Sequence, residues 1–264
     1  MKNFEKESAE IWVDARREAA EVSEAEPALE NLLIDVILSR QDLFDAVAAR
    51  ISRKLGHNAV AERDIYDIFK EAFAADKLIR ERIVADIIAI RQRDPACSGY
   101  LHPIMYFKGF MSITSHRVAH WLWENGRKHL AYYIQSLCSE IFGVDIHPAA
   151  RFGGGILLDH ATSFVAGETS VVEDNVSILH EVTLGGTGNE TGDRHPKVQS
   201  GVLIGAGAKL IGNIKIGKCA KIGAGSVVLE DVPPHTTVVG VPAHSTDIIP
   251  EKNPAQRMNQ NICG

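Results

Sequence analysis

A dense group of ionisable side chains lies in one short, Gly-rich segment, residues 185–201. Four of them fall within five consecutive positions there: Asp193, Arg194, His195 and Lys197. An arginine guanidinium can bind a carboxylate at two points, and an imidazole can exchange a proton near neutral pH because its unperturbed pKa is about 6.5. Loops that hold such side chains on a rigid scaffold commonly carry function. We therefore expect residues 185–201 to form a binding loop.

The scaffold for this loop is indicated by a six-residue repeat in the second half of the chain. Aliphatic residues recur at every sixth position without a gap: Ile204, Leu210, Ile216, Ile222 and Val228. Two earlier series keep the same period: Val172, Ile178 and Leu184, and Ile146, Phe152, Leu158 and Phe164. Short strands with one inward aliphatic residue per hexad are typical of a parallel β-helix, in which a full coil takes about 18 residues. The uninterrupted period disfavours the alternative, an ordinary Gly-rich β-sandwich.

The six-residue frame is expected to slip once. Leu184 and Ile204 are 20 residues apart, which is not a multiple of six, so residues 185–201 are expected to leave the coil as one extended loop. Insertions of this kind usually map to one face of a solenoid, often the binding face. His160 keeps the phase of Val172 and Ile178, and its side chain is therefore predicted to point inward.

The first half of the chain has a helical pattern instead. Apolar residues recur three or four positions apart over residues 29–55, which predicts an amphipathic helix, and residues 64–75 and 76–91 repeat the pattern. A loop is expected at 93–101, because proline disfavours helical geometry in the residue before it, followed by further helix over 102–140. The fold class is thus α+β. We expect a helical domain at 1–140, a β-helix at 141–245 and a flexible polar tail at 246–264.

Composition excludes several classes of function. The net charge of -6 over 264 residues argues against a nucleic-acid-binding face built on bulk charge. No run of 18 apolar residues predicts a membrane span, and the N-terminus lacks the apolar core of a secretory signal. The four cysteines are widely spaced, which is typical of free thiols in a reducing compartment: Cys97, Cys138, Cys219 and Cys263. A cytoplasmic protein is expected.

Four strings of the sequence resemble those of the serine O-acetyltransferases, a family of hexapeptide-repeat acyltransferases. They are RDPAC at 93–97, GVDIHPAARFGGGILLDHAT at 143–162, GGTGNETGDRHPK at 185–197 and VVGVPA at 238–243. The resemblance covers nearly the whole chain. It implies that the β-helix is left-handed, that three copies associate through it, and that two such trimers join through the helical domains as a hexamer.

The reaction that the resemblance implies moves an acetyl group from acetyl-CoA to the hydroxyl of L-serine. The products are O-acetyl-L-serine and CoA, in the first step of cysteine biosynthesis from serine, with acetyl-CoA as co-substrate and with no permanently bound cofactor or metal. By the same resemblance His160 is the general base and Asp145 orients its ring. We expect direct attack in a ternary complex, without an acetylated enzyme.

Four residues are placed around serine by the resemblance. Arg194 would bind the carboxylate, Asp94 and Asp159 would lie around the ammonium and hydroxyl groups, and His195 would lie beside the substrate, where it could stabilise an oxyanion. Each residue also has a plainer interpretation. Asp94 could be a turn residue before Pro95, Arg194 and His195 could be solvated loop charges, and His160 and Asp145 could be turn residues.

The implied CoA site lies along the groove between neighbouring β-helices. The positions that match are Gly186, Ala206, Lys221 and Ala224. A glycine or alanine there would let the pantetheine arm approach closely, and the lysine could meet a phosphate. The repeat pattern alone explains these four residues equally well.

Two further ligands or partners follow from the resemblance. L-cysteine differs from serine by sulfur for oxygen, so it is expected to inhibit by competing at the Arg194 and Asp94 site. Family members commonly insert a C-terminal tail ending in Ile into the active site of O-acetylserine sulfhydrylase. This tail ends Ile262-Cys263-Gly264, without a terminal Ile, so that partnership stays open.

Three other functions remain as alternatives. One is a hexapeptide acetyltransferase for another small acceptor, such as a sugar or an amine. The second is a zinc hydratase on the same scaffold that uses histidines among His147, His160, His180 and His195, although we expect no stoichiometric zinc. The third is a structural partner protein with an inactive site.

Overall fold

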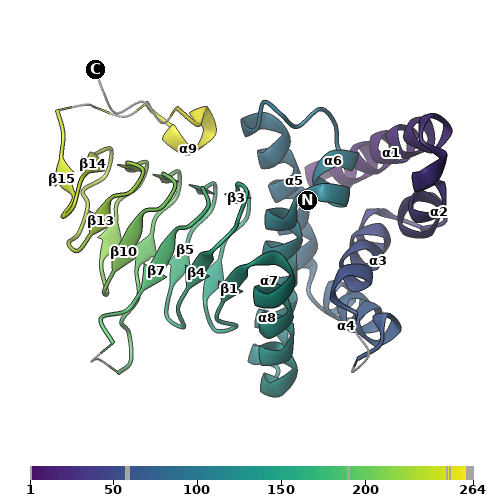
Figure 1. Cartoon of the computed structure of the whole chain (residues 1–264), viewed down its shortest axis with the longest axis horizontal. Coiled ribbons are helices and arrows are strands. Elements are labelled where there is room, and N and C mark those ends of the chain that lie inside the picture. The colour runs from purple at the N-terminus through teal and green to yellow at the C-terminus, as the bar shows by residue number, and fades with distance from the viewer. Residues whose placement is uncertain (1, 57–59, 189–190, 248, 250, 260–264) are drawn as a thin grey trace.

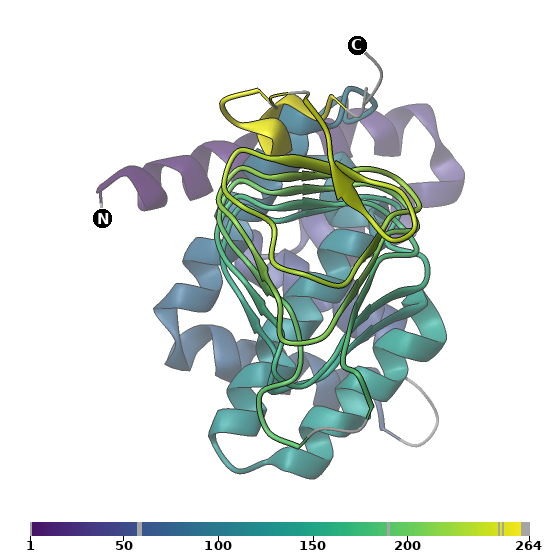
Figure 2. The same ribbon diagram turned by 90° about the vertical axis from the view of Figure 1, so that its left-hand side faces the viewer.

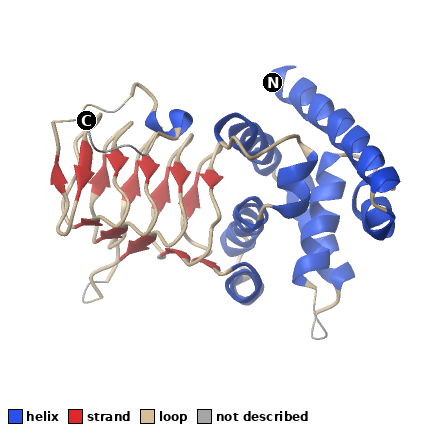
Figure 3. Ribbon diagram, turned by 45° about the horizontal axis from the view of Figure 1, so that its top comes forward, coloured by secondary structure: helices blue, strands red, loops and turns tan. Residues whose placement is uncertain are grey.

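The computed structural model describes residues 2–56, 60–188, 191–247, 249 and 251–259. A helical region and a parallel β-solenoid lie end to end along the long axis of the molecule (Figure 1), with the helices and strands almost fully segregated (Figure 3). The predicted α+β fold with an N-terminal helical region followed by a parallel β-helix is confirmed. No helix in the described ranges is long and apolar enough to cross a membrane.

The helical region contains eight α-helices among the described residues. Their bounds are α1 (Lys2–Ala25), α2 (Glu30–Leu33), α3 (Leu43–Leu55), α4 (Glu62–Ala75), α5 (Lys77–Arg93), α6 (Leu101–Tyr106), α7 (Lys108–Glu124) and α8 (Lys128–Phe142). The apolar pattern over 29–55 predicted one helix, but the chain breaks before Asp42, whose carboxylate accepts the amide N–H of Asp45 at 2.8 Å and caps α3. At the other end Gly143 adopts a left-handed conformation (φ 67°) that stops α8 and starts the solenoid.

The solenoid has three sheets whose strands are parallel apart from β15, and each of its first four coils gives one strand to each sheet. Sheet A contains β1 (Val144–Ile146), β4 (Phe164–Ala166), β7 (Thr183–Gly185), β10 (Lys209–Ile211) and β13 (Val227–Val228). Sheet B contains β2 (Arg151–Phe152), β5 (Val171–Val172), β8 (Lys197–Val198) and β11 (Lys215–Ile216). Sheet C contains β3 (Leu157–Leu158), β6 (Ser177–Ile178), β9 (Leu203–Ile204), β12 (Lys221–Ile222), β14 (Thr237–Val239) and the antiparallel β15 (His244–Ser245).

Seen along its axis, the solenoid is a rounded triangle (Figure 2). We call the corner between sheets A and B the AB corner, and the corner where sheet C leads into sheet A of the next coil the CA corner. The loop between β7 and β8 projects from the AB corner. Stacked aliphatic side chains fill the interior, for example Leu158, Ile178, Ile204 and Ile222 in sheet C, all of them buried.

The prediction that the repeat frame slips only once was wrong. Paired residues in neighbouring coils are 18 apart for Ile204 and Ile222, 26 apart for Ile178 and Ile204, and 20 apart for Leu158 and Ile178. The second value reflects the predicted loop. The third reflects two extra residues at the first CA corner, residues 159–163, which no repeat count over 202–228 could reveal.

This first CA corner also overturns the predicted inward orientation of His160. Its side chain is 74% exposed. Three residues of the corner other than glycine have left-handed backbone conformations, namely His160, Ala161 and Ser163. The chain therefore turns outward at His160, and the core position that the hexad phase gave to residue 160 does not exist.

A fully buried ion pair joins the helical region to the first coil. Arg117 of α7 binds both carboxylate oxygens of Asp86 on α5, and both side chains are almost completely excluded from solvent. Arg117 also donates to the carbonyl of Gly153 at 2.6 Å, and Asp86 accepts the N–H of Ile156 at 2.8 Å. The loop between β2 and β3 is thereby tied to both helices. This junction fixes α5 and α7 relative to the first coil of the solenoid.

The described part of the tail lies against sheet C (Figures 1 and 2). Its short helix α9 (Pro254–Arg257) packs on α5 and β9, and the Ser177 hydroxyl donates to the carbonyl of Ala255 at 2.7 Å. Residues 251–259, predicted to be flexible, thus run across the solenoid surface. Ile262, Cys263 and Gly264 lie outside the described residues.

Candidate active site

A cleft of about 410 Å³ opens where the end of α5, the start of α7 and the first CA corner meet. Three of the predicted site residues line it together: Asp94, Asp159 and His160. Its other walls come from α6 and the start of α7, with His102, Tyr106 and Lys108 among the lining residues. The sequence analysis missed these three, because the pattern over 102–140 indicated only helix.

His160 projects from the CA corner with little packing around its ring. Its Nε2 lies 3.8 Å from Oδ2 of Asp159. The ring of His180, one coil further along the same corner, stands nearly perpendicular to it with the ring centroids 5.7 Å apart. An exposed imidazole beside a carboxylate is well placed to accept a proton from a substrate in the cleft.

The two aspartates of the cleft come from different parts of the fold. Asp159 follows β3, and Asp94 follows α5, where its carboxylate accepts the N–H of Ala96 at 2.8 Å. Burial raises the pKa of Asp159, the negative charge of Asp94 raises it further, and His160 lowers it. A second carboxylate so close to Asp159 favours a cationic group between the two.

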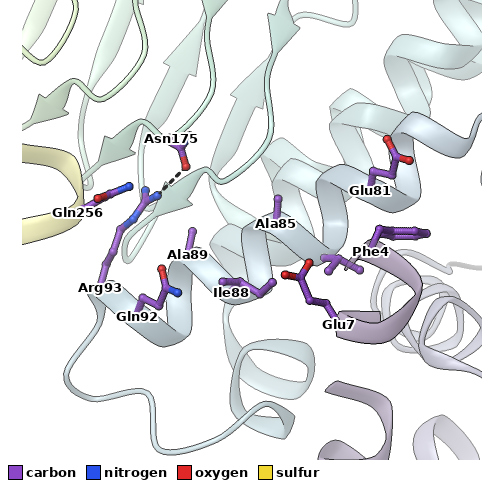
Figure 4. A pocket seen from close by; sticks show the side chains of 11 residues that line it. Phe4, Glu7, Glu81, Ala85, Ile88, Ala89, Gln92, Arg93, Asn175 and Gln256 are labelled. Atoms are coloured by element: carbon purple, nitrogen blue, oxygen red, sulfur yellow. Dashed lines mark hydrogen bonds between the residues drawn. The ribbon is translucent and has the colours of Figure 1, made fainter. Parts of the chain in front are cut away.

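Arg93 fixes the end of α5, and hence the position of Asp94. Its side chain is 5% exposed and donates to the carbonyl of Gly155 at 3.0 Å and to Oγ of Ser177 and Oδ1 of Asn175, each at 3.2 Å. Figure 4 shows the Arg93 side chain extending from α5 to Asn175 of the solenoid, beside Gln256 of the tail. These three residues line part of a second cavity of about 400 Å³. Burial lowers the pKa of Arg93 to about 10, so it stays cationic at neutral pH.

Asp145, the predicted partner of His160, has a different neighbour. It lies on β1, and its Oδ1 accepts a hydrogen bond of 2.6 Å from Nε2 of Gln135 on α8. Within the described ranges no hydrogen bond or ion pair joins Asp145 to His160. The structure therefore places both on the first coil but does not pair their side chains.

His195 lies in the loop at the AB corner, where the fold holds it tightly. It is 7% exposed, and its Nδ1 accepts the N–H of Thr169 at 3.2 Å and lies 2.9 Å from Oγ1 of Thr169. Because Nδ1 accepts a backbone hydrogen bond, the ring proton is on Nε2. Burial lowers the pKa of His195, and the charges of Arg194 and Lys197 lower it further, which favours the neutral ring. Its Nε2–H is therefore a neutral donor.

Arg194 is held in the same loop by an ion pair. Its Nη2 donates to Oε2 of Glu168 at 2.8 Å, and its Nη1 donates to the carbonyl of Gly192 at 3.0 Å. This hydrogen bond to Arg194 lowers the pKa of Glu168. The guanidinium is thus oriented by the loop and is only partly buried.

In one chain the predicted serine-binding residues form two groups at different corners. Asp94, Asp159 and His160 lie at the CA corner, and Arg194 and His195 lie at the AB corner. Strand β4 separates the two corners of that coil, and its three residues span about 10 Å. The histidines divide likewise, with His147 at the AB corner and His180 at the CA corner. No group of three potential metal ligands occurs among the described residues.

The four residues predicted to contact CoA also lie in different parts of the solenoid. Ala206 and Ala224 stack on the CA corner below His160 and His180, with the Gly225 N–H bound to the Ala206 carbonyl at 2.8 Å. Gly186 follows β7 at the AB corner. Lys221 on β12 is 2% exposed, in the outward row of sheet C that also holds Ser177 beneath the tail. A phosphate could reach Lys221 only after local movement.

Comparison with known proteins agrees with this architecture. A family profile described as "Bacterial transferase hexapeptide (six repeats)" matches residues 195–230, and one described as "Serine acetyltransferase, N-terminal" matches residues 11–115. The serine acetyltransferase of Haemophilus influenzae is 48% identical over 255 residues, which cover 97% of this chain and 96% of that protein.

Three solved structures resemble the chain and contain ligands. Serine acetyltransferase from Brucella abortus in complex with coenzyme A is 53% identical, with a TM-score of 0.88, and the match covers 89% of this chain and 94% of that one. Soybean serine acetyltransferase complexed with serine is 51% identical (TM-score 0.90; 91% and 99% covered). A serine acetyltransferase in complex with cysteine is 47% identical (TM-score 0.94; 97% and 100% covered).

The solenoid of hexapeptide repeats and the profile that matches it define the class, a hexapeptide-repeat transferase. Within that class, the helical region and the relatives that match nearly the whole chain are specific. The chain belongs to the serine acetyltransferase family.

Proposed function

We propose that the chain transfers an acetyl group from acetyl-CoA to the hydroxyl of L-serine, giving O-acetyl-L-serine and CoA. The observation that carries this proposal is the meeting of Asp94, Asp159 and His160 in one cleft of a chain of this family. The cleft offers a base for the hydroxyl and two carboxylates for the ammonium group of an amino acid. The solved relatives with bound serine and bound coenzyme A support both substrates.

In the proposed reaction His160 acts as general base. It takes the hydroxyl proton as the serine oxygen attacks the thioester carbon, forming a C–O bond and a tetrahedral oxyanion. Nε2–H of His195 donates to that oxyanion. The C–S bond then breaks, and His160 returns the proton to the thiolate of CoA. Asp145 would orient His160 only after a change of partner, because its carboxylate binds Gln135 in the single chain.

We further propose that one site is built from two copies of the chain. Arg194, which would bind the serine carboxylate, and His195 lie at the AB corner, while the cleft lies at the CA corner. In a cyclic trimer each interface joins two different surfaces of the chain, and in the proposed trimer these are the AB corner of one copy and the CA corner of the next. The trimer, and its pairing as a hexamer through the helical regions, are parts of this proposal.

Acetyl-CoA would lie along the groove between two copies, beside Ala206 and Ala224 on the same corner as His160. Gly186 would come from the AB corner of the neighbouring copy. Lys221 would reach a phosphate only after a change in the local structure, since its side chain is 2% exposed in the single chain.

Inhibition by L-cysteine is proposed at the same serine site. A relative with bound cysteine supports this ligand. Binding of O-acetylserine sulfhydrylase through the tail and a cytoplasmic location remain predictions from the sequence.

The proposal is tested by CoA release from acetyl-CoA with and without L-serine. We expect a serine-dependent rate that is lost in folded His160→Ala, and a raised KM for serine in Arg194→Ala. The Lys128→Met variant, on the helical region away from the cleft, is the control. A folded parent chain without serine-dependent release would contradict the proposal, and activity with a panel of other acceptors would then favour the alternative acetyltransferase.

A further inference from the structure

The corner that carries His160 has an uncommon backbone. His160, Ala161 and Ser163 all have positive φ angles, of 56°, 61° and 61°. Residues other than glycine adopt this left-handed region rarely, because the β-carbon crowds the backbone, and they keep it only where surrounding contacts impose it. Something in the fold must therefore hold residues 159–163 in place.

Backbone hydrogen bonds supply part of that restraint, and Thr162 is central to them. The N–H of Thr162 binds the carbonyl of His160 at 2.8 Å, and its own carbonyl accepts the N–H of Glu181 from the next coil at 2.7 Å. The N–H of Ala161 binds the carbonyl of Asp159 at 2.6 Å. These bonds lie within the solenoid, and none of them connects the corner to the helical wall of the cleft.

That connection is made by the first two residues of α7. Lys108 donates from Nζ to Oγ1 of Thr162 at 2.6 Å, although the two are 54 residues apart in the chain. Gly109 packs so closely on β3 that a β-carbon there would lie 1.9 Å from the carbonyl oxygen of Leu158. The start of α7 thus packs on β3, the strand that leads into the first CA corner, and Lys108 forms a hydrogen bond with the corner itself.

We propose that Lys108 and Thr162 form a positioning pair for His160. The ammonium group of Lys108 binds the middle of the left-handed turn, and so fixes the direction in which His160 projects into the cleft. The pair acts through the backbone of residues 160–162 and needs no contact with substrate. This proposal rests on the proposed role of His160 as general base.

The competing role for Lys108 is direct binding of a substrate anion, because it also lines the cleft. The two roles predict different kinetics. A substrate ligand would be insensitive to Thr162, and its loss would chiefly raise the KM for serine or acetyl-CoA. A positioning pair would lower kcat, and either partner's loss would have the same effect, because the two substitutions remove one interaction.

The test compares Thr162→Val, Thr162→Ser, Lys108→Met and the double variant Lys108→Met/Thr162→Val. Valine keeps the shape of threonine but removes the acceptor, whereas serine keeps it. We expect kcat to fall about 10- to 100-fold in Thr162→Val, Lys108→Met and the double variant alike, with both KM values within about twofold of the parent. Thr162→Ser should stay within about twofold of the parent in kcat.

Crystal structures of the parent and of Thr162→Val give a readout that does not depend on activity. We expect the parent to keep positive φ at residues 160, 161 and 163, and the variant to show a displaced corner with His160 turned from its parental direction. An unchanged corner in Thr162→Val, an unchanged kcat, or additive losses in the double variant would overturn the positioning pair. A parent without serine-dependent activity but with a displaced variant corner would overturn the proposed function alone.

Discussion

Nε2 of His195 occupies the space that a side chain on residue 167 would need. A β-carbon built on Gly167 would lie 1.9 Å from that nitrogen. The ring is held on its other edge by Thr169, so it cannot move away without losing those contacts. His195 can therefore lie against the AB corner only because residue 167 is a glycine and has no side chain.

Gly167→Ala is accordingly expected to displace His195 without unfolding the solenoid. Loss of one donor to an oxyanion lowers kcat by about 10²- to 10³-fold, and we expect a fall of that order in kcat for serine acetylation. Lys128→Met is the control, because Lys128 is an exposed residue of the helical region away from the AB corner. Parental kcat in folded Gly167→Ala would refute the assigned role of His195.

The buried Asp86–Arg117 pair is expected to dominate the stability of the junction. Arg117→Met leaves the Asp86 carboxylate buried and unpaired, which costs about 3–5 kcal/mol of unfolding free energy. Lys6→Met, which removes an exposed pair with Glu10, should change it by about 1 kcal/mol or less. Denaturant unfolding at one fixed chain concentration measures both. Equal effects would show that the junction does not depend on this ion pair.

His116 predicts how stability depends on pH. Burial, and then the charges of His120 and Arg117, hold the pKa of His116 well below its usual 6.5, and its Nε2 lies 3.1 Å from the carbonyl oxygen of Ala150. Below pH 6.5 the unfolded chain binds a proton at this residue that the folded chain does not bind. The contribution of neutral His116 to the free energy of unfolding is therefore fully present above pH 6.5. It is lost as the pH falls below that value, by up to about 1.4 kcal/mol per pH unit.

The measurement is unfolding free energy between about pH 7.5 and pH 5.5. We expect His116→Gln to reduce the loss of stability over this range and the exposed His129→Gln to leave it unchanged. A loss of the same size in His116→Gln would assign the pH dependence to other groups.

The sequence predicted the solenoid well because its signal is local and repeated. Each hexad must bury one aliphatic side chain, so Ile204, Leu210, Ile216 and Ile222 indicate the sheets directly. The same rule failed at His160, because two extra residues at the first CA corner shift the phase, and no residue type marks them. The tail gave no periodic signal, and its packing against Ser177 and β9 could not be predicted.

The candidate site was predictable in part. Asp94 and Asp159 are 65 residues apart in the chain, and only the family resemblance placed them together. Lys108 and His102 were missed because a helical pattern does not show which side chains reach another element. The division of the site between two corners is a property of the closed triangle, so the spacing of Arg194 and His160 along the chain gave no indication of it.

The central claim, that two copies complete one site around His160, is tested most directly by mixing two variants that are each impaired in serine acetylation, at a serine concentration well below the KM of Arg194→Ala. His160→Ala and Arg194→Ala are unfolded together, refolded as a mixture of equal amounts and assayed for serine-dependent CoA release. In a cyclic trimer a site is intact when one copy supplies His160 and the next supplies Arg194, which random mixing gives at about one quarter of the sites. We predict recovery of about one quarter of the parental rate, with each variant refolded alone as the baseline. A mixture no more active than the mean of the two variants, from oligomers shown to contain both, would contradict the shared site.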